Sequence, residues 1–135
     1  MITKTQYFRN KPHTIKQDAD ADMMLARVNL FLYHKAQKGQ YSYPIDPDTD
    51  TTISGKKNGT GGGGFRLQDE EGAKHSSHKE AKAVDVFDPD DELDNNTTDE
   101  ELEAHGLYRE HPSATPGWMH LTTRPPSSRH RTFYP

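Results

Sequence analysis

Three polar residues, His78, Asp85 and His120, stand in or near two segments whose alternating pattern predicts β-strands. Asp85 lies in AKAVDVFD (81–88), and His120 lies in WMHLTT (118–123). A carboxylate or an imidazole on a strand face is costly to bury unless it is paired or bound to an ion. The two strand residues could satisfy each other, or they could join His78 to hold a cation. Zinc accepts both donor types, and a catalytic zinc typically has three protein ligands and one open position.

The composition limits the kinds of site and partner. The 135-residue chain has no cysteine, so a metal site must use His, Asp or Glu. A net charge of -4 argues against general nucleic-acid binding. No apolar run approaches the roughly 20 residues that cross a membrane, and the N-terminus lacks the apolar core of a signal peptide. We therefore expect synthesis in a cytoplasm, with no nucleic-acid or membrane partner.

The two motifs resemble those of a known peptidase group. SSHKEAKAVD resembles the Ser-x-His-x-x-Gly-x-Ala-x-Asp motif of the zinc D-Ala-D-Ala carboxypeptidases and L-alanyl-D-glutamate peptidases, the M15 peptidases. The matching residues are Ser76, His78, Ala83 and Asp85. Ala81 takes the glycine position, and GWMHL resembles the second motif, Trp-x-His. The similarity spans roughly residues 20–135, and the C-terminal tail is similar to small bacteriophage members.

The resemblance implies a fold, a cofactor and several residue roles. The fold would be the Hedgehog/D-Ala-D-Ala peptidase-like fold, a small antiparallel sheet with flanking helices and long loops. Zinc would be bound by His78, Asp85 and His120. Ser76 and Trp118 would lie beside these ligands, although Ser76 could equally be a turn residue. The family arginine that holds the substrate follows a Ser-Gly turn. Here Ser54 and Gly55 are followed by a glycine-rich stretch, so Arg66 is the candidate, with an ordinary surface arginine as the rival.

The sequence departs from the family at the general base. The family has a Glu or Asp three residues before the second histidine, and this chain has Gly117 there. A zinc hydrolase without its general base would lose about 10²–10⁴-fold in rate. Glu110, on a flexible approach to the strand, is the first candidate for a substitute base. Asp88, just beyond the first strand, is the reserve.

The elements that must position these residues are short. The segment 18–39 predicts a helix, because Leu25, Val28 and Leu32 share one face and Gly39 can end it. TTIS predicts a short strand, and RTFYP predicts a last strand. TTDEELEAHGLY predicts a short helix with a Thr98/Glu101 capping box that stops near Gly106. The order predicts a small α+β protein, with residues 1–17 as an extended N-terminal arm and residues 18–135 as a single zinc peptidase-like domain.

Two further segments predict loops. GKKNGTGGGG lacks the spacing of a phosphate-binding P-loop, and we interpret it as loop. The acidic stretch DPDDELDNNTTD has Leu93 where an EF-hand loop requires glycine, so we interpret it as a solvated loop.

Two functions of different class remain open at this stage. The first is a phage-type zinc peptidase that acts on stem or cross-link peptides of peptidoglycan. The second is a non-catalytic structural component of a phage head, neck or tail, which keeps the fold and metal while its arm and tail bind other phage proteins. A low hydrophobic fraction of 30% suits a subunit that depends on a metal or on neighbours for part of its order. A peptidase incorporated in the virion would satisfy both.

Overall fold

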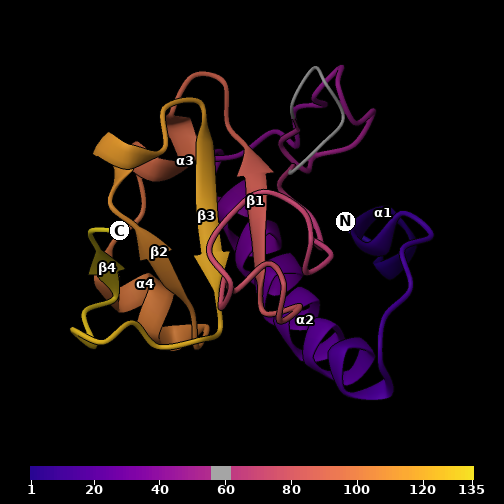
Figure 1. The fold of residues 1–135 in the computed structure, drawn as a ribbon. Coiled ribbons are helices and arrows are strands. Elements are labelled where there is room, and N and C mark those ends of the chain that lie inside the picture. The colour runs from indigo at the N-terminus through magenta and orange to yellow at the C-terminus, as the bar shows by residue number, and fades with distance from the viewer. Residues whose placement is uncertain (56–61) are drawn as a thin grey trace.

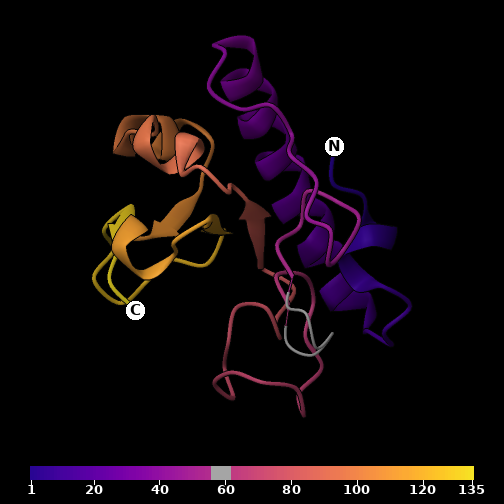
Figure 2. The same cartoon turned by 90° about the horizontal axis from the view of Figure 1, so that it is seen from above.

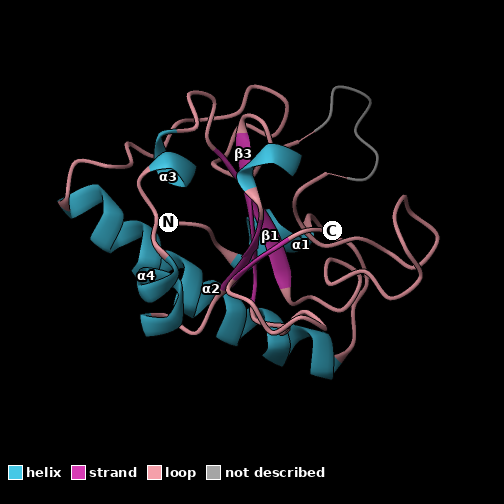
Figure 3. Cartoon of the chain, turned by 90° about the vertical axis from the view of Figure 1, so that its left-hand side faces the viewer, coloured by secondary structure: helices cyan, strands magenta, loops and turns pink. Residues whose placement is uncertain are grey.

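The computed structural model describes residues 1–55 and 62–135 and shows an α+β protein built on a four-stranded sheet of order β1-β3-β2-β4 (Figure 1). Most connections between elements are short, and the two longest precede β1 and β4 (Figure 3). The elements are α1 (Lys4–Phe8), α2 (Ile15–Gln37), β1 (Ala83–Phe87), α3 (Glu92–Asn95), α4 (Asp99–Ala104), β2 (Tyr108–Glu110), a 3₁₀ turn (Pro112–Ala114), β3 (Trp118–Thr122) and β4 (Thr132–Phe133). None of the helices in the described ranges is long and apolar enough to cross a bilayer.

The sheet is mixed, whereas the sequence analysis expected an antiparallel one. β3 pairs antiparallel with β1 and with β2, but β4 pairs parallel with β2, with Arg109 opposite Thr132. The chain leaves β3 through a loop that reverses its direction and returns to the free edge of β2. β4 therefore runs in the same direction as β2. The parallel pairing could not be predicted from RTFYP, because the sequence analysis gave that strand no partner.

One face of the sheet forms the core. Alternation along β1 and β3 sends Val84, Val86, Met119 and Leu121 to the same face, where all four are fully buried. They belong to one apolar cluster with the α2 residues Met24, Leu25, Val28, Phe31 and Leu32. Seen from above, the helices lie on one side of the sheet and the loop that enters β1 lies on the other (Figure 2). The opposite face carries Asp85 and His120.

The long helix α2 begins earlier than expected. The sequence analysis began it at residue 18, but Thr14 is the N-cap and forms a capping box with Gln17. Reciprocal bonds between a threonine side chain and the residue three positions later satisfy two otherwise free backbone groups. The predicted end is confirmed, because Gly39 adopts a left-handed φ of 70° directly after the helix.

Residues 1–17 are not an extended arm. The segment contains α1 and the first turn of α2, and its side chains Ile2, Tyr7 and Phe8 are buried. The Tyr7 hydroxyl donates a 2.8 Å hydrogen bond to the carbonyl of Ala83 on β1. The N-terminal segment is thus part of the core. Polar residues surround these three in the sequence, so no apolar periodicity indicated that the segment is buried.

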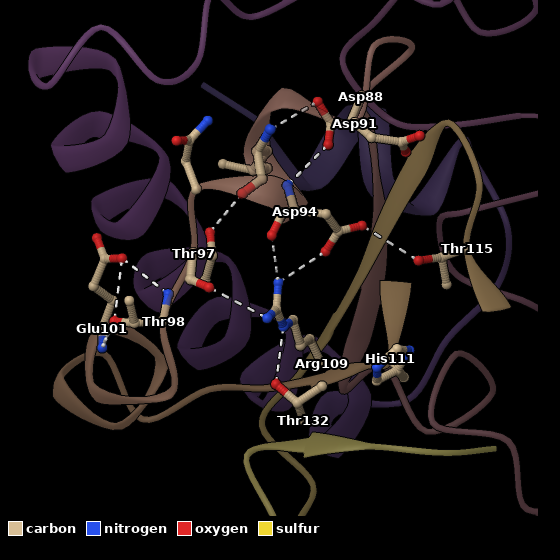
Figure 4. A network of polar contacts seen from close by, with 12 residues as sticks. Asp88, Asp91, Asp94, Thr97, Thr98, Glu101, Arg109, His111, Thr115 and Thr132 are labelled. Atoms are coloured by element: carbon tan, nitrogen blue, oxygen red, sulfur yellow. Dashed lines mark hydrogen bonds and ion pairs between the residues drawn. The ribbon is translucent and has the colours of Figure 1, made fainter. Parts of the chain in front are cut away.

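Two other predictions need correction. The expected strand TTIS makes only two isolated bridges, Thr51 with Asp46 and Ile53 with Val86. The acidic stretch is not a solvated loop, because it contains α3 and a buried network (Figure 4). Asp94 accepts a hydrogen bond from Arg109 at 3.1 Å, and the Asp88 carboxylate accepts backbone N–H groups of α3. Residues 56–61 of the predicted glycine-rich loop lie outside the described residues.

A buried ion pair joins α2 to α4. The Lys35 side chain is 1% exposed, and its ammonium group lies 2.9 Å from the Glu101 carboxylate. Lys38, which is 54% exposed, reaches the same carboxylate oxygen at 2.9 Å. Glu101 also closes the predicted capping box with Thr98, which is confirmed. Although partial burial opposes its ionisation, Lys35 and Lys38 lower the pKa of Glu101 to about 2.

We expect Glu101→Gln to lower the free energy of unfolding by about 3 kcal/mol at neutral pH, because the buried ammonium of Lys35 loses its counter-charge. Lys38→Met is the matched control and should cost under about 1 kcal/mol, since its ammonium is exposed. The contribution of Glu101 is present above its unfolded pKa and is lost as pH falls through its folded pKa. The difference between wild type and Glu101→Gln should therefore shrink below pH about 4.5. Equal losses for the two variants in urea denaturation would contradict this account.

Candidate metal centre

Three neighbouring strands carry polar residues on the sheet face opposite the core. Asp85 on β1 pairs directly with His120 on β3. On the other side of β3, Arg109 of β2 pairs with Leu121, so the next residue of β2, Glu110, comes beside His120. Because side chains alternate along each strand, Asp85, His120 and Glu110 share one face in a row across the sheet.

His78 completes a compact set of donor atoms. Its Nε2 lies 3.2 Å from Asp85 Oδ1, and His120 Nδ1 lies 2.8 Å from the same oxygen. One ligand atom from each of the three residues lies within 4.8 Å of the others, and all three residues are buried. Ligands about 2.1 Å from a tetrahedral ion lie about 3.4 Å apart. The spacing therefore fits a metal ion after small adjustments of the side chains.

The loop before β1 fixes the orientation of His78. The carbonyl of Gly64 lies 3.0 Å from His78 Nδ1, so this nitrogen carries the proton and donates it. The opposite nitrogen, Nε2, faces Asp85 and is the atom that would bind a metal ion. A backbone carbonyl in this place selects the tautomer that a metal requires.

Glycines are needed where this loop approaches the site. A Cβ atom at Gly63 would lie 2.5 Å from the Ser54 carbonyl oxygen and 2.7 Å from the Asp85 Cβ. A Cβ atom at Gly64 would lie 2.7 Å from the Tyr7 carbonyl oxygen. No side chain fits at either position without displacing backbone. The described part of the glycine-rich stretch therefore brings its backbone against β1 and α1, and thereby sets the position of the carbonyl that orients His78.

The electrostatics favour a cation among these groups. Burial alone would raise the pKa of Asp85, but the imidazoles of His78 and His120 hold it well below its usual range. Burial would likewise lower the pKa of His120, yet the hydrogen bond to Asp85 and the charge of Glu110 raise it. An ionised carboxylate in a buried place thus attracts positive charge. A metal ion bound here would take the place of protons.

The set opens into a cavity of about 600 Å³ that also contains most of the predicted site residues. Arg66 lines it, with Nη2 at 3.8 Å from Asp85 Oδ2 and Nε donating to the Gly62 carbonyl. Glu110 lines the same cavity from β2, so it lies on a strand and not on a flexible approach. Glu110 and Arg66 therefore line one cavity.

Ser76 and Trp118 lie in the same cavity, in different ways. The Ser76 hydroxyl accepts a 3.2 Å hydrogen bond from the backbone N–H of His78, which is the pattern of a serine turn. It thereby supports the backbone of a ligand residue. Trp118 stands two residues before His120 on the same strand face and also lines a smaller neighbouring cavity of about 290 Å³. It forms a wall of the cleft.

Asp88 and Gly117 do not contribute side chains to the cleft. The two carboxylate oxygens of Asp88 accept N–H groups of Leu93 and Asp94, each at 3.1 Å, and the residue is absent from the cavity lining. Asp88 was the reserve base, and its hydrogen bonds make it a structural group instead. Gly117 adopts a φ of 83°, where any other side chain is strained, and its N–H donates to Asp91. A glutamate at position 117 would disturb this turn.

A second group, Asp88, Asp91 and Asp94, also has carboxylate oxygens within 4.8 Å of one another and could hold a cation. Its members already accept hydrogen bonds from backbone N–H groups, Arg109 and Thr115 (Figure 4). Burial, together with the neighbouring Asp88 charge, raises the pKa of Asp94 to about 6 despite Arg109. These hydrogen bonds give the three aspartates a structural role, because they link α3 to the sheet.

Comparison with family models, with curated proteins and with solved structures gives no match for this chain. The case for the site therefore depends on its geometry and on the motifs in the sequence.

We expect one equivalent of a divalent cation per chain, with zinc as the probe ion. Protein purified without chelators should retain it in the wild type and in His130→Ala, whose histidine is exposed and not part of the set. The double variant His78→Ala, His120→Ala should retain none, because two of three ligands are lost. Elemental analysis measures the ratio. Full zinc retention by the double variant would refute this assignment.

Metal removal should also lower the melting temperature, by on the order of 10 °C. The three ligands come from the loop before β1, from β1 and from β3, so one ion ties separate segments together. Thermal melting before and after dialysis against a chelator, with re-addition of zinc, measures the effect. An unchanged midpoint after demonstrated metal loss would show that the site contributes nothing to folding.

Proposed function

We propose that the chain is a zinc-dependent peptidase of the M15 type that hydrolyses peptide bonds of peptidoglycan. The observation that carries the proposal is the row Asp85, His120 and Glu110 across three strands, with His78 closing the metal set beside a cavity. A metal set alone would fit a structural site. A further carboxylate beside the set, facing an open cavity, is what hydrolysis needs. The choice of peptidoglycan rests on the sequence resemblance.

Zinc bound at this set would polarise the scissile carbonyl and lower the pKa of an attacking water. Glu110 is the general base: it takes a proton from that water and passes it to the leaving amine. Its place on β2 beside His120 is compatible with both transfers. The carboxylate therefore comes from the adjacent strand and not from the turn before His120, where the family has it.

Arg66 holds the substrate in this proposal. Its guanidinium is fixed by the Gly62 carbonyl and points toward the Asp85 carboxylate, on a wall of the cavity. There it can donate to the carbonyl oxygen on which negative charge develops. Trp118 supplies an apolar wall along which the peptide can lie.

The alternative, a structural phage component that keeps the metal, has less support after the fold is known. It drew on an arm free to bind neighbours, but Ile2, Tyr7 and Phe8 are buried within this chain. It also drew on the absence of a carboxylate at Gly117, and Glu110 faces the cleft instead. Association with a phage particle remains compatible with a peptidase.

Glu110→Gln should lower kcat for hydrolysis of defined muropeptides by about 10²–10⁴-fold, because the amide cannot accept the proton of the water. Zinc content and melting temperature should stay near the wild-type values. Asp88→Asn is the matched control: it changes the other candidate base, and it should lower stability with little effect on kcat. Digests with and without added zinc, followed by mass spectrometry, give both rates. The proposal fails if the wild type cleaves no peptide, or if Glu110→Gln cleaves as fast as the wild type.

A further inference from the structure

The helix α2 carries a second set of apolar side chains, on its outer side. In the part of the chain that the structure describes, seven large apolar side chains are exposed, and four of them belong to α2: Ile15, Met23, Leu30 and Tyr33. Exposed apolar residues that are scattered singly over a surface are ordinary and need no explanation. Four on one helix are a surface that can bind a partner.

These side chains share one face of the helix. At about 100° per residue, they fall together with the exposed Ala19 and Ala26 within an arc of about 80°. From Ala19 to Tyr33 the spacing alternates between four and three residues, which is the spacing of a coiled-coil contact. Core residues of α2 such as Val28 lie on the opposite side of the helix. We call the run of exposed residues Ala19, Met23, Ala26, Leu30 and Tyr33 the outer seam.

The sizes of the residues in the outer seam favour a second copy of this chain in antiparallel orientation. In a parallel pair each residue would face its own counterpart. The layers of two leucines and two tyrosines would then hold the helices apart, and a gap would remain between the two Ala26 residues. In an antiparallel pair Ala26 faces Leu30 of the second copy, and Met23 faces Tyr33. The small residue at the centre of the outer seam then meets a large one, which fills the contact.

The charges along α2 favour the same orientation. Its first half has three aspartates and two lysine partners, which leaves one negative charge: Asp18, Asp20 and Asp22 with Lys4 and Lys16. Its second half has three cations and one acidic partner, which leaves two positive charges: Arg27, Lys35 and Lys38 with Glu101. A parallel pair would place like halves together. An antiparallel pair places the negative half of one copy beside the positive half of the other.

We infer that two copies of this chain form a dimer through the outer seam, with their α2 helices antiparallel. The inference goes beyond the proposed function and does not depend on it. Because α2 packs on the core face of the sheet and the metal set lies on the other face, both cavities stay open in the dimer. One pair of helices is a smaller contact than the interface of an obligate dimer, so we expect a dissociation constant on the order of 10–100 µM.

Sedimentation velocity of the purified full chain, over a concentration series that spans this value, tests the association. Leu30→Glu should weaken the dimer by at least about 10-fold, because it places a charge at the centre of the contact. Ile45→Glu is the matched control: Ile45 is 54% exposed, Leu30 is 51% exposed, and only Leu30 lies on α2. The control should leave the dimer unchanged, and both variants should melt near the wild-type temperature. A wild type that stays monomeric at every concentration would overturn the inference and leave the outer seam to a different partner. Equal weakening by the two variants would also overturn it.

Disulfide trapping tests the orientation, because the chain has no cysteine of its own. A mixture of Met23→Cys and Tyr33→Cys proteins should form a mixed disulfide under mild oxidation. Each variant alone should not, because ten residues of helix separate Met23 from its counterpart in an antiparallel pair by about 15 Å, too far for a disulfide. Rapid disulfide formation within each variant alone would indicate a parallel pair and would contradict the inferred arrangement.

Discussion

The structure depends on one buried carboxylate. Asp85 is held on β1 between the imidazoles of His78 and His120, with Arg66 at 3.8 Å, on the face of the sheet that does not form the core. A charge in this place is costly unless cations or hydrogen bonds surround it. The requirement explains why Gly63 and Gly64 bring backbone so close, and why the neighbouring strands place His120 and Glu110 on the same face. The metal proposal follows from the same constraint, because a cation satisfies it most completely.

Polar networks supply much of the order that a small apolar core cannot. Only 30% of the residues are hydrophobic, yet one continuous cluster contains the N-terminal segment, α2 and the sheet. Around it, Lys35 and Glu101 join α2 to α4, while Asp94 and Arg109 join α3 to β2. Both links position β2, and β2 carries Glu110. The candidate base is therefore supported by ion pairs distant from the cleft, and their loss should affect the site as well as the fold.

Much of the architecture was predictable, since strong local patterns survive in the structure. The α2 periodicity, the Thr98 capping box and the strands around Asp85 and His120 are all present. The features that the sequence analysis missed depend on contacts between distant segments. The missed strand β2 is three residues long, and it exists only because it pairs with β3 and β4, which local sequence does not encode. The same holds for the buried tyrosine of α1 and for the Gly64 carbonyl that orients His78, because both depend on contacts between segments far apart in the chain. The only local signal of β2 was the alternation in LYRE, and the only local signal of the Gly64 contact was the glycine run.

The most direct measurement of the central claim is anomalous diffraction at the zinc edge from crystals of the zinc-loaded protein. The account predicts a peak bound by His78 Nε2, an Asp85 oxygen and His120 Nδ1 at about 2.0–2.2 Å, with one position open to the cavity. It also predicts the Glu110 carboxylate within hydrogen-bond reach of a ligand in that open position, about 2.6–3.2 Å. A zinc peak at Asp88, Asp91 and Asp94 instead, or no peak between the histidines while the fold is intact, would contradict the account.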